Sequence, residues 1–516
     1  MSSNDSAARA LGWIPPAAAA YTAATLVRYY LAAPSPRFPV ESAFFILLGV
    51  GVLSVLVRRR RLEGVEEAGD AARSGAEAAN VAALAGVFVA VAFVVYAPAL
   101  RVGLLSDDFV IARWAERFEL VHLEATGFVR PGVPAFWWML QRWPGDFATA
   151  AHAANIVLHG VNAALVSLVA LRFGLRRAAA VAAGVMFVLF AGLSEAVVWL
   201  SGVQDVLMTT LALTAVALAA ADEPWIVGAV VVGVAALLVK ETAVVIPVLS
   251  ALVIFSRDGL RVSRRHRRVL AVLAVVTAIY VVARTTAGLP SSFLAVSDWQ
   301  YFTKQLMASS FAALGAPWTE DWGRMHAGLA LLRSTAILAL VAAAFFVWRR
   351  GDATFRAAAA CAGWVLAAVL PVFSLFYIGP YLEGARYLYL PAAGFVILLA
   401  LLIGLIVDRV GPRWQVGAFV LLTAALAMPI LPAIRSDIRR WQAAAATRQD
   451  ILERVAEQAD RWACTTFTAE GQADSVSGAY VFRHGLAEAL DRQRGDSEVR
   501  CRVVMRPGEF GMTREP

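Results

Sequence analysis

Long apolar segments recur along the chain, and no other feature restricts its fold as strongly. Residues 387–407, for example, contain no charged side chain. Such segments have about 18 to 25 residues, the length needed to cross a hydrocarbon core about 30 Å thick. They must be helices, because no water is present there to satisfy the backbone. With 60% hydrophobic and 16% charged residues, the 516-residue chain is predicted to be an all-α polytopic membrane protein.

Basic clusters between the apolar segments set the predicted topology. The positive-inside bias puts such clusters on the cytoplasmic side. This placement gives about thirteen spans in the inner or plasma membrane, with the amino terminus cytoplasmic and the carboxyl terminus external. The predicted spans are 10–32, 38–57, 77–98, 151–171, 178–199, 204–221, 225–239, 242–256, 269–287, 327–348, 357–376, 387–407 and 414–434.

The first predicted span has an alternative interpretation. Pro15, Pro16 and Arg28 interrupt it, so a cleaved signal peptide is the competing assignment. Residues 1–9 lack the basic region that begins a signal peptide, and this favours the span.

The net charge of +8 follows from the same clusters and not from a nucleic-acid site. Because the arginines gather in short loops, their charge indicates membrane topology and some attraction to anionic lipid headgroups. Membrane lipids are therefore expected partners, and nucleic acid is not.

The topology divides the chain into three regions. Residues 1–76 hold two additional spans, residues 77–435 form the main transmembrane module, and residues 436–516 form a small α/β tail. The long external loops of the main module are predicted at 99–150 and 288–326.

Cysteine placement fits this division. Cys361 falls in a predicted span, where it acts as a small apolar residue. Cys464 and Cys501 fall in the tail, which the topology places in an oxidising compartment. They are candidates for a disulfide, and two unrelated thiols are the alternative.

Two adjacent carboxylates, Asp107 and Asp108, stand where the third span ends. Alone, they are explained as the cap of a following helix near residues 109–118. Other charged residues fall at the same predicted level, however, and these suggest a shared site. They are Glu195, Asp205, Lys240, Glu241 and Arg386.

Lys240 carries extra weight because lysine is rare here, with two lysines against 44 arginines (46 minus 2). A charge near the bilayer centre costs about 2.5 to 3.5 kcal/mol on insertion scales. The alternative for Lys240 and Glu241 is a helix break with both side chains reaching outward to water.

The motifs resemble the GT-C glycosyltransferases, in particular the branch of protein O-mannosyltransferases and of transmembrane mannosyltransferases with tetratricopeptide repeats. The resemblance covers about residues 77–435. The chain departs from that branch in its two additional spans, in a tail without the repeats, and in Gln204 where relatives often have Arg. The motifs, in order, are SDDF, GFVRPGVPAFWW, AHAANIVLHGVNA, SEAVVWLSGVQDVL, LLVKETAVVIP and ARYLYLPAAGF.

The resemblance implies transfer of a sugar from a polyprenyl-phosphate donor to an acceptor hydroxyl on the external side. By position in the motif, Asp107 is the base that takes the hydroxyl proton. Asp108 then orients Asp107, strengthens it as a base by like-charge proximity, or helps to hold Mg or Mn. No obligatory cofactor is expected, although a divalent cation stays open. Sugar and acceptor are not specified.

The leaving phosphate needs cations. Arg386 is the first candidate, because its planar fork suits phosphate oxygens, and Lys240 is the second. Arg130 either pairs with the two aspartates or approaches the phosphate. The remaining acids balance these charges or bind sugar hydroxyls; they are Glu195, Asp205 and Glu241.

Three polar residues lie on one face of the span at 151–171, at i, i+3 and i+7: His152, Asn155 and His159. Hydrogen bonding between helices explains them best, and a site-lining role and metal ligation are the alternatives. The sequence has no tight cluster of His, Cys or Asp at ligand spacing.

Other functions remain open for a chain of this kind. A transporter or lipid flippase also carries charges in its spans, but it more often has repeated halves and midplane charges. A lipid-linked polysaccharide polymerase or ligase is the nearer enzymatic alternative. A catalytically silent scaffold is the last, since fold alone does not establish activity.

Overall fold

The computed structural model describes residues 70–121, 129–259, 261–287, 353–375, 384–427, 430–471, 474–494, 499–506 and 509–515. The predicted spans 10–32, 38–57 and 327–348 lie outside the described residues, as do the predicted loop 288–326 and most of the N-terminal region 1–76.

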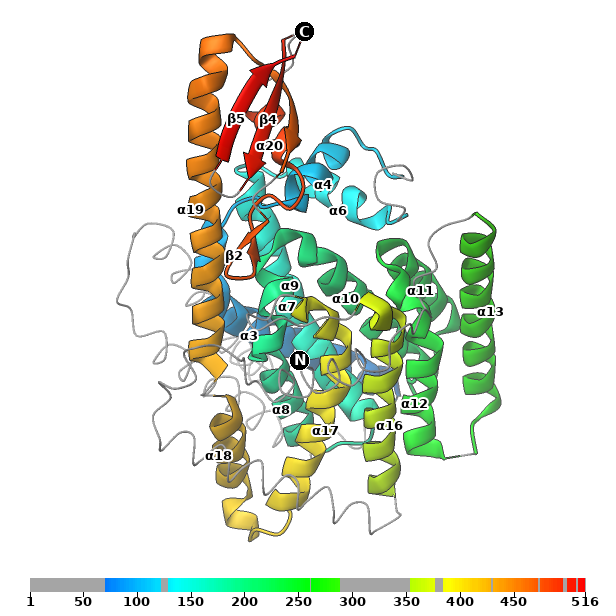
Figure 1. Ribbon diagram of the computed structural model, residues 1–516. Coiled ribbons are helices and arrows are strands. Elements are labelled where there is room, and N and C mark those ends of the chain that lie inside the picture. Colours follow the sequence, from blue (N-terminus) through cyan, green and yellow to red (C-terminus); the bar gives the residue numbers. More distant parts are fainter. Residues whose placement is uncertain are drawn as a thin grey trace, which may run out of the picture.

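Within the described ranges, seven helices are long and apolar enough to cross a membrane, or up to eight if a bent pair counts as one span. They pack as a bundle below the C-terminal strands (Figure 1). Together with the shorter helices that pack among them, the helices of the bundle are α3 (Asp70–Tyr96), α7 (Phe147–Arg172), α8 (Arg177–Val188), α9 (Ser194–Val198), α10 (Val203–Ala219), α11 (Ile226–Val239), α12 (Ile246–Asp258), α13 (Arg264–Thr286), α16 (Ala353–Val369), α17 (Tyr389–Val407), α18 (Gln415–Ala427) and α19 (Ile430–Trp462).

The predicted count of thirteen spans is not reached, for two physical reasons besides the undescribed segments. Helices α11 and α12 have 14 and 13 residues. At 1.5 Å per residue they are about 20 Å long and shorter than a bilayer core. The predicted span 178–199 is bent by 56° between α8 and α9. In each case the apolar run breaks beside a buried charge, Lys240 or Glu195.

Helix α7 is at the centre of the bundle, in contact with α3, α8 and α10. Small residues allow the close packing. A Cβ added at Gly160 would lie 2.4 Å from the Cα of Val89, so α3 and α7 nearly touch along their backbones. Such small-residue contacts are typical of helices packed within membranes.

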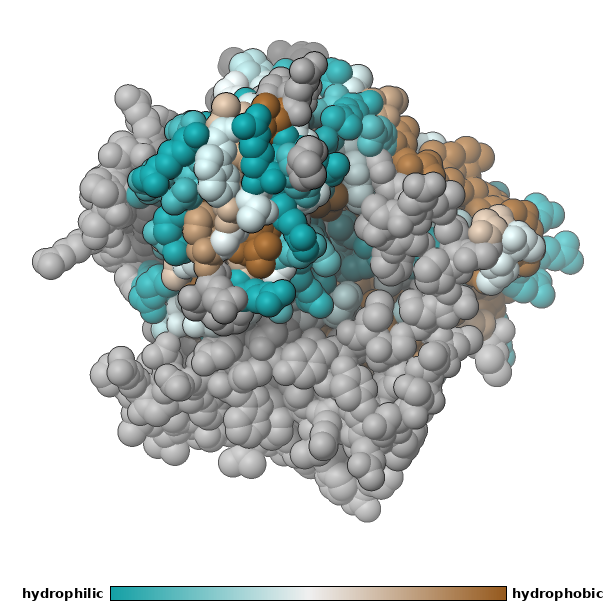
Figure 2. All heavy atoms as spheres, turned by 45° about the horizontal axis from the view of Figure 1, so that its top comes forward, coloured by the Kyte–Doolittle hydropathy of each residue, from teal (hydrophilic) through white to brown (hydrophobic). Residues whose placement is uncertain are grey.

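The outer helices expose apolar side chains instead. Val231 of α11 and Val275, Ile279 and Val282 of α13 are all exposed. Figure 2 shows hydrophilic residues gathered over the strand-bearing end, while hydrophobic residues reach the surface toward the side on which Figure 1 draws α13. An apolar flank beneath a polar end is the pattern expected of a protein seated in a bilayer.

Short helices lie at the strand-bearing end of the bundle. Helices α4 (Asp107–Glu116) and α6 (Gly132–Gln141) pack on each other there, near the C-terminal sheet (Figure 1). Turns of 3₁₀ helix join several of the longer elements. They are η1 (Ala97–Arg101), η2 (Ala191–Leu193), η3 (Leu200–Gly202), η4 (Glu241–Val245), η7 (Leu370–Leu375), η8 (Ala385–Leu388) and η9 (Pro412–Trp414).

The C-terminal region has a small sheet packed beside the end of α19. In this sheet β1 pairs in parallel with β4, and β4 pairs antiparallel with β5; a separate hairpin holds β2 and β3. Helix α19 has 33 residues and runs through residue 436, so the last predicted span and the tail share one helix. The elements are β1 (Thr466–Glu470), β2 (Ser475–Val476), β3 (Ala479–Tyr480), α20 (Leu486–Arg494), β4 (Arg500–Arg506) and β5 (Glu509–Arg514).

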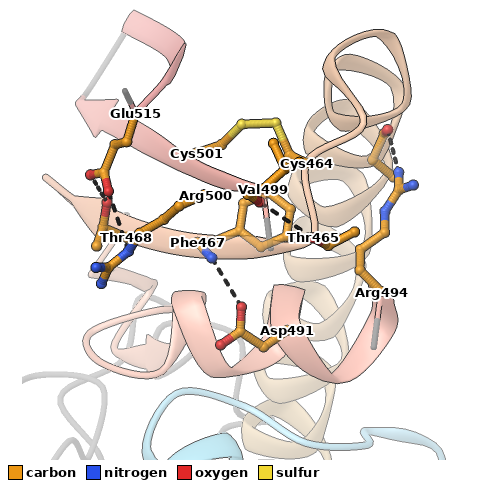
Figure 3. Close-up of a disulfide and its surroundings, with 11 residues drawn as sticks. Cys464, Thr465, Phe467, Thr468, Asp491, Arg494, Val499, Arg500, Cys501 and Glu515 are labelled. Carbon is orange, nitrogen blue, oxygen red and sulfur yellow. Dashed lines mark hydrogen bonds and ion pairs between the residues drawn. A yellow bond between two sulfur atoms is a disulfide. The ribbon is translucent and has the colours of Figure 1, made fainter. Parts of the chain in front are cut away.

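A disulfide ties the sheet to the helix. Cys464, just beyond α19, is bonded to Cys501 of β4, with the Cα atoms 5.8 Å apart (Figure 3). Asp491 of α20 accepts a hydrogen bond from the backbone N–H of Phe467 at 3.0 Å and so holds the crossover helix under the sheet. In the chain-entropy model, closing a loop of 37 residues stabilises a fold by about 4 kcal/mol.

Candidate functional site

The predicted site residues occupy helix starts and helix breaks. Asp107 and Asp108 begin α4, and Asp205 lies in the first turn of α10. Lys240 and Glu241 lie between α11 and α12, where helical hydrogen bonding stops and restarts. Helix ends leave backbone groups that need partners, which makes them natural places for charged side chains.

The two adjacent aspartates differ in environment. Asp108 is fully buried, and its Oδ1 accepts hydrogen bonds from the backbone N–H and hydroxyl of Ser201 at 2.8 and 2.5 Å. Its Oδ2 accepts one from the Leu105 N–H at 2.8 Å. Asp107 is half-buried, and its Oδ1 accepts a hydrogen bond from the Ser106 hydroxyl at 3.3 Å. Asp108 therefore joins α4 to the segment before α10, while Asp107 keeps contact with the surface.

Burial dominates the chemistry of Asp108. Removal from water raises its pKa to about 8, the Ser201 and Leu105 hydrogen bonds oppose this, and the neighbouring Asp107 charge adds a smaller rise. An acid with this pKa holds its proton at neutral pH, so it serves α4 as a buried hydrogen-bonding group.

Replacing Asp108 by Asn is expected to flatten the dependence of stability on pH. Between the unfolded value of 3.8 and the folded value of about 8, only the folded protein keeps the proton. Because of Asp108, the free energy of unfolding of the wild type therefore falls as the pH rises, by up to about 1.4 kcal/mol per pH unit. Thermal melts in detergent between about pH 5 and 8 measure this slope. Parallel curves for the two proteins would contradict the assignment.

Arg386, which is half-buried, pairs with the buried Glu195 across the bundle. The Arg386 Nη1 donates to Glu195 Oε1 at 3.0 Å, and the Arg386 backbone N–H donates to Oε2, also at 3.0 Å. Gly384, with φ at 81°, makes the left-handed turn that brings η8 to α9. The side chain of Glu195 is only 2% exposed, so its charge depends on Arg386.

Lys240 pairs with Asp205, its Nζ lying 2.5 Å from Oδ1. One aromatic ring joins this pair to the previous one. The Lys240 Nζ lies 5.2 Å from the ring centroid of Tyr387, and the Arg386 Cζ lies 5.1 Å from the same centroid. Both distances are within the range of cation–π attraction. The two candidate phosphate-binding cations therefore flank a single tyrosine.

Arg130 pairs with Glu241, a partner that the sequence did not predict. Its Nε donates to Oε2 at 2.9 Å and its Nη2 to Oε1 at 2.5 Å. Burial opposes ionisation, yet Arg130 lowers the pKa of Glu241 to about 2. Arg130 also donates to Gln204, the residue before Asp205.

Gly132 explains how Arg130 reaches this position. A Cβ added at Gly132 would lie 2.7 Å from Val239 Cγ2 and 3.2 Å from the Leu238 carbonyl oxygen. Only glycine allows α6 to start against the end of α11. Arg130, two residues before Gly132, then lies beside Glu241.

Trp199 connects the aspartate turn to the ion pairs. Its indole N–H donates to the Leu105 carbonyl at 3.3 Å, close to Asp107 in the chain. Its ring centroid lies 4.6 Å from the Arg386 Cζ. Arg386 and the Leu105 carbonyl, two residues before Asp107, thus contact the same side chain.

The histidines of α7 have structural contacts. His159 Nδ1 lies 2.7 Å from the Tyr389 hydroxyl, and its Nε2 lies 3.1 Å from the Val188 carbonyl, so it joins α7, α8 and α17. His152 Nε2 lies 3.2 Å from the Gly103 carbonyl, in the loop that leads to Asp107. Asn155 is buried beside them on α7, and its Nδ2 has no hydrogen-bond partner among the described residues.

Several contributing residues were missed by sequence reasoning. Ser201 and Trp199 fall within the motif SEAVVWLSGVQDVL, but nothing in their pattern indicates a partner. Asp437 of α19 is buried, and it accepts hydrogen bonds from Arg440 and from the Ser194 hydroxyl. A buried acid within a membrane-length helix is the signal that could have identified it.

In the described ranges of the chain, no group of three or more His, Cys, Asp or Glu residues is placed to hold a metal ion. No protein-family model matches the chain, and no curated protein matches it either. The chemical interpretation therefore depends on the geometry of the site and on the motifs.

Proposed function

We propose that the chain is an integral membrane glycosyltransferase that transfers a sugar from a polyprenyl-phosphate donor to a hydroxyl of a protein, lipid or glycan. Asp107 is the general base, and Arg386 and Lys240 bind the leaving phosphate. The reaction takes place on the external side of the cell membrane, with the amino terminus cytoplasmic and the carboxyl terminus external.

One observation carries the proposal: two cation–carboxylate pairs with buried carboxylates flank Tyr387, and Trp199 contacts both Arg386 and the turn that holds a half-buried Asp107. Buried charges at membrane depth are costly and mark functional sites by default. Transfer from a phosphosugar requires a carboxylate that can take a proton and cations that can stabilise a phosphate, and Asp107, Arg386 and Lys240 would supply these groups.

The proposed step is a displacement at the anomeric carbon. The acceptor hydroxyl gives its proton to the Asp107 carboxylate, and its oxygen forms a bond to the sugar carbon. The bond from that carbon to the phosphate oxygen breaks, and its electron pair leaves with the polyprenyl phosphate. Arg386 suits this leaving group, because a guanidinium presents planar donors to phosphate oxygens.

The carboxylates Glu195 and Asp205 fit the same scheme. Each holds its cation in place at 3.0 or 2.5 Å before the donor binds. A cation that is already held in position lowers the free-energy cost of reorganising the site when negative charge develops on the phosphate. The disulfide in the tail supports an external carboxyl terminus, because such bonds persist in oxidising compartments.

Reconstitution in liposomes tests the proposal. The full-length protein receives polyprenyl-phosphate mannose, glucose or galactose, and release of polyprenyl phosphate in the presence of peptide, lipid or oligosaccharide acceptors is measured. We expect release from at least one donor, coupled to acceptor glycosylation. Movement of intact donor between leaflets without release would instead support a flippase.

A further inference from the structure

The residue before Asp107 has an unusual backbone conformation. Ser106 has φ at 51° and ψ at −122°, the values of the first central residue of a type II′ turn. The Asp108 N–H donates to the Leu105 carbonyl at 3.0 Å and closes this turn. Glycine is preferred at such a position, because a side chain strains the backbone there. Other contacts must therefore hold Ser106 in place.

Those contacts come from the C-terminal tail. The Ser106 N–H donates to the Val481 carbonyl at 2.9 Å, and the His484 N–H donates to the Ser106 hydroxyl at 3.3 Å. Gly485 lies directly against the turn, where a Cβ would be 2.5 Å from the Ser106 carbonyl oxygen. Residues 481–485 thus enclose Ser106, which is fully buried.

The same hydroxyl continues the chain of hydrogen bonds to Asp107. It accepts from the His484 N–H and donates to Asp107 Oδ1. The Ser106 hydroxyl has a single proton to donate. Because the His484 N–H already points at the hydroxyl oxygen, the hydroxyl proton is directed at the Asp107 carboxylate. The tail therefore influences how Asp107 is oriented, and it does so through Ser106.

Two ion pairs and a ring contact hold the tail against α4. Arg113 lies 3.0 Å from Asp491, and Arg492 lies 2.5 Å from Glu116. The rings of Phe109 and Phe482 are 5.9 Å apart. The two ion pairs join α4 to α20, and the ring contact joins α4 to Phe482 of the preceding segment. Several contacts therefore hold the tail against α4.

We propose that residues 481–485 are a positioning segment for the active site, which holds Ser106 in its turn so that the Ser106 hydroxyl orients Asp107. The inference depends on the proposed function, since it assigns Asp107 as the base. It adds that the tail is required for the chemical step and does not serve only as an external appendage.

Gly485→Ala, compared with Gly174→Ala, tests the positioning. Both glycines have nearly the same φ, 84° and 86°, so both variants carry a similar backbone cost, but Gly174 has nothing within 4 Å of an added Cβ. We expect Gly485→Ala in the full-length protein to increase hydrogen exchange at the Ser106 and Asp108 amides and to lower kcat at least 10-fold. Gly174→Ala should change neither.

Ser106→Ala and Ser106→Gly keep the test valid if Gly485→Ala does not fold. Both remove the hydroxyl, and the glycine also relieves the positive φ. We expect both to lower kcat about 10-fold with KM unchanged, for the donor that the wild type consumes fastest.

The outcomes separate the two proposals. If wild-type protein transfers sugar but Gly485→Ala has wild-type exchange and kcat, the positioning role is wrong and the proposed function stands. Wild-type kinetics in both Ser106 variants would have the same meaning. If the wild type transfers no sugar while Gly485→Ala still exchanges faster, the docking is real and the glycosyltransferase assignment, with the catalytic role of the segment, is overturned.

Discussion

Asp107→Asn is expected to lower the rate of sugar transfer by about 10²- to 10⁴-fold, the usual contribution of a general base. The substitution keeps the size of the side chain and removes only its ability to take a proton. Asp107 is half-buried, and its hydrogen bond from the Ser106 hydroxyl is long, at 3.3 Å, so the fold should tolerate the amide. Initial rates of polyprenyl-phosphate release measure the loss, and a thermal melt checks the fold.

Asp108→Asn is the matched control for this experiment, since it makes the same chemical change one residue away. The Asp108 carboxyl is engaged by Ser201 and Leu105, so we expect its substitution to act first on stability and its pH dependence. A wild-type transfer rate in Asp107→Asn would exclude Asp107 as the base. Loss of activity only in Asp108→Asn would move that role to the buried residue.

Arg386→Gln is expected to destabilise the protein by about 3 to 5 kcal/mol, because it leaves the Glu195 carboxylate buried without its partner. The double variant Arg386→Gln/Glu195→Gln removes both charges and should recover most of this stability. If Arg386 also binds the donor phosphate, the double variant should still transfer sugar about 10²- to 10³-fold more slowly than wild type. Denaturation in detergent measures the loss of stability, and the rate of polyprenyl-phosphate release measures the loss of transfer.

The Arg176–Asp408 pair provides a control away from the site. Its side chains are 76% and 40% exposed, and exposed pairs contribute about 0 to 1 kcal/mol. Arg176→Gln/Asp408→Asn should therefore leave stability and transfer unchanged. Full recovery of transfer in the double variant at Arg386 and Glu195 would mean that Arg386 serves only to neutralise Glu195.

Apolar length was enough to locate many of the helices. The span predicted at 151–171 is α7, Phe147–Arg172, and the span predicted at 387–407 coincides closely with Ala385–Val407. Length failed at 178–199, where a run long enough to span the membrane is bent by 56°. The bend places Glu195 against Arg386, and a hydropathy pattern contains no information about a partner so distant in the sequence.

The sequence did not indicate how the charged residues pair. Arg130 was predicted to pair with the two aspartates or to approach the phosphate, but its partner is Glu241, 111 residues away. The choice depends on the start of α6 at Gly132 and on the rotation of neighbouring helices, neither of which has a periodic signature. The contact of Val481 with Ser106 could not be predicted, because the tail lacks a recognisable motif.

The contact between His484 and Ser106 has a consequence for biosynthesis. These residues are 378 positions apart, and domains are synthesised at about 5 to 20 residues per second, so the second is made roughly 20 to 75 seconds after the first. Until then the turn beside Asp107 lacks two of its hydrogen bonds. A nascent chain halted before residue 481 would hold the ion pairs within the bundle but an unfinished aspartate turn, so this turn is completed only after the bundle helices have been synthesised.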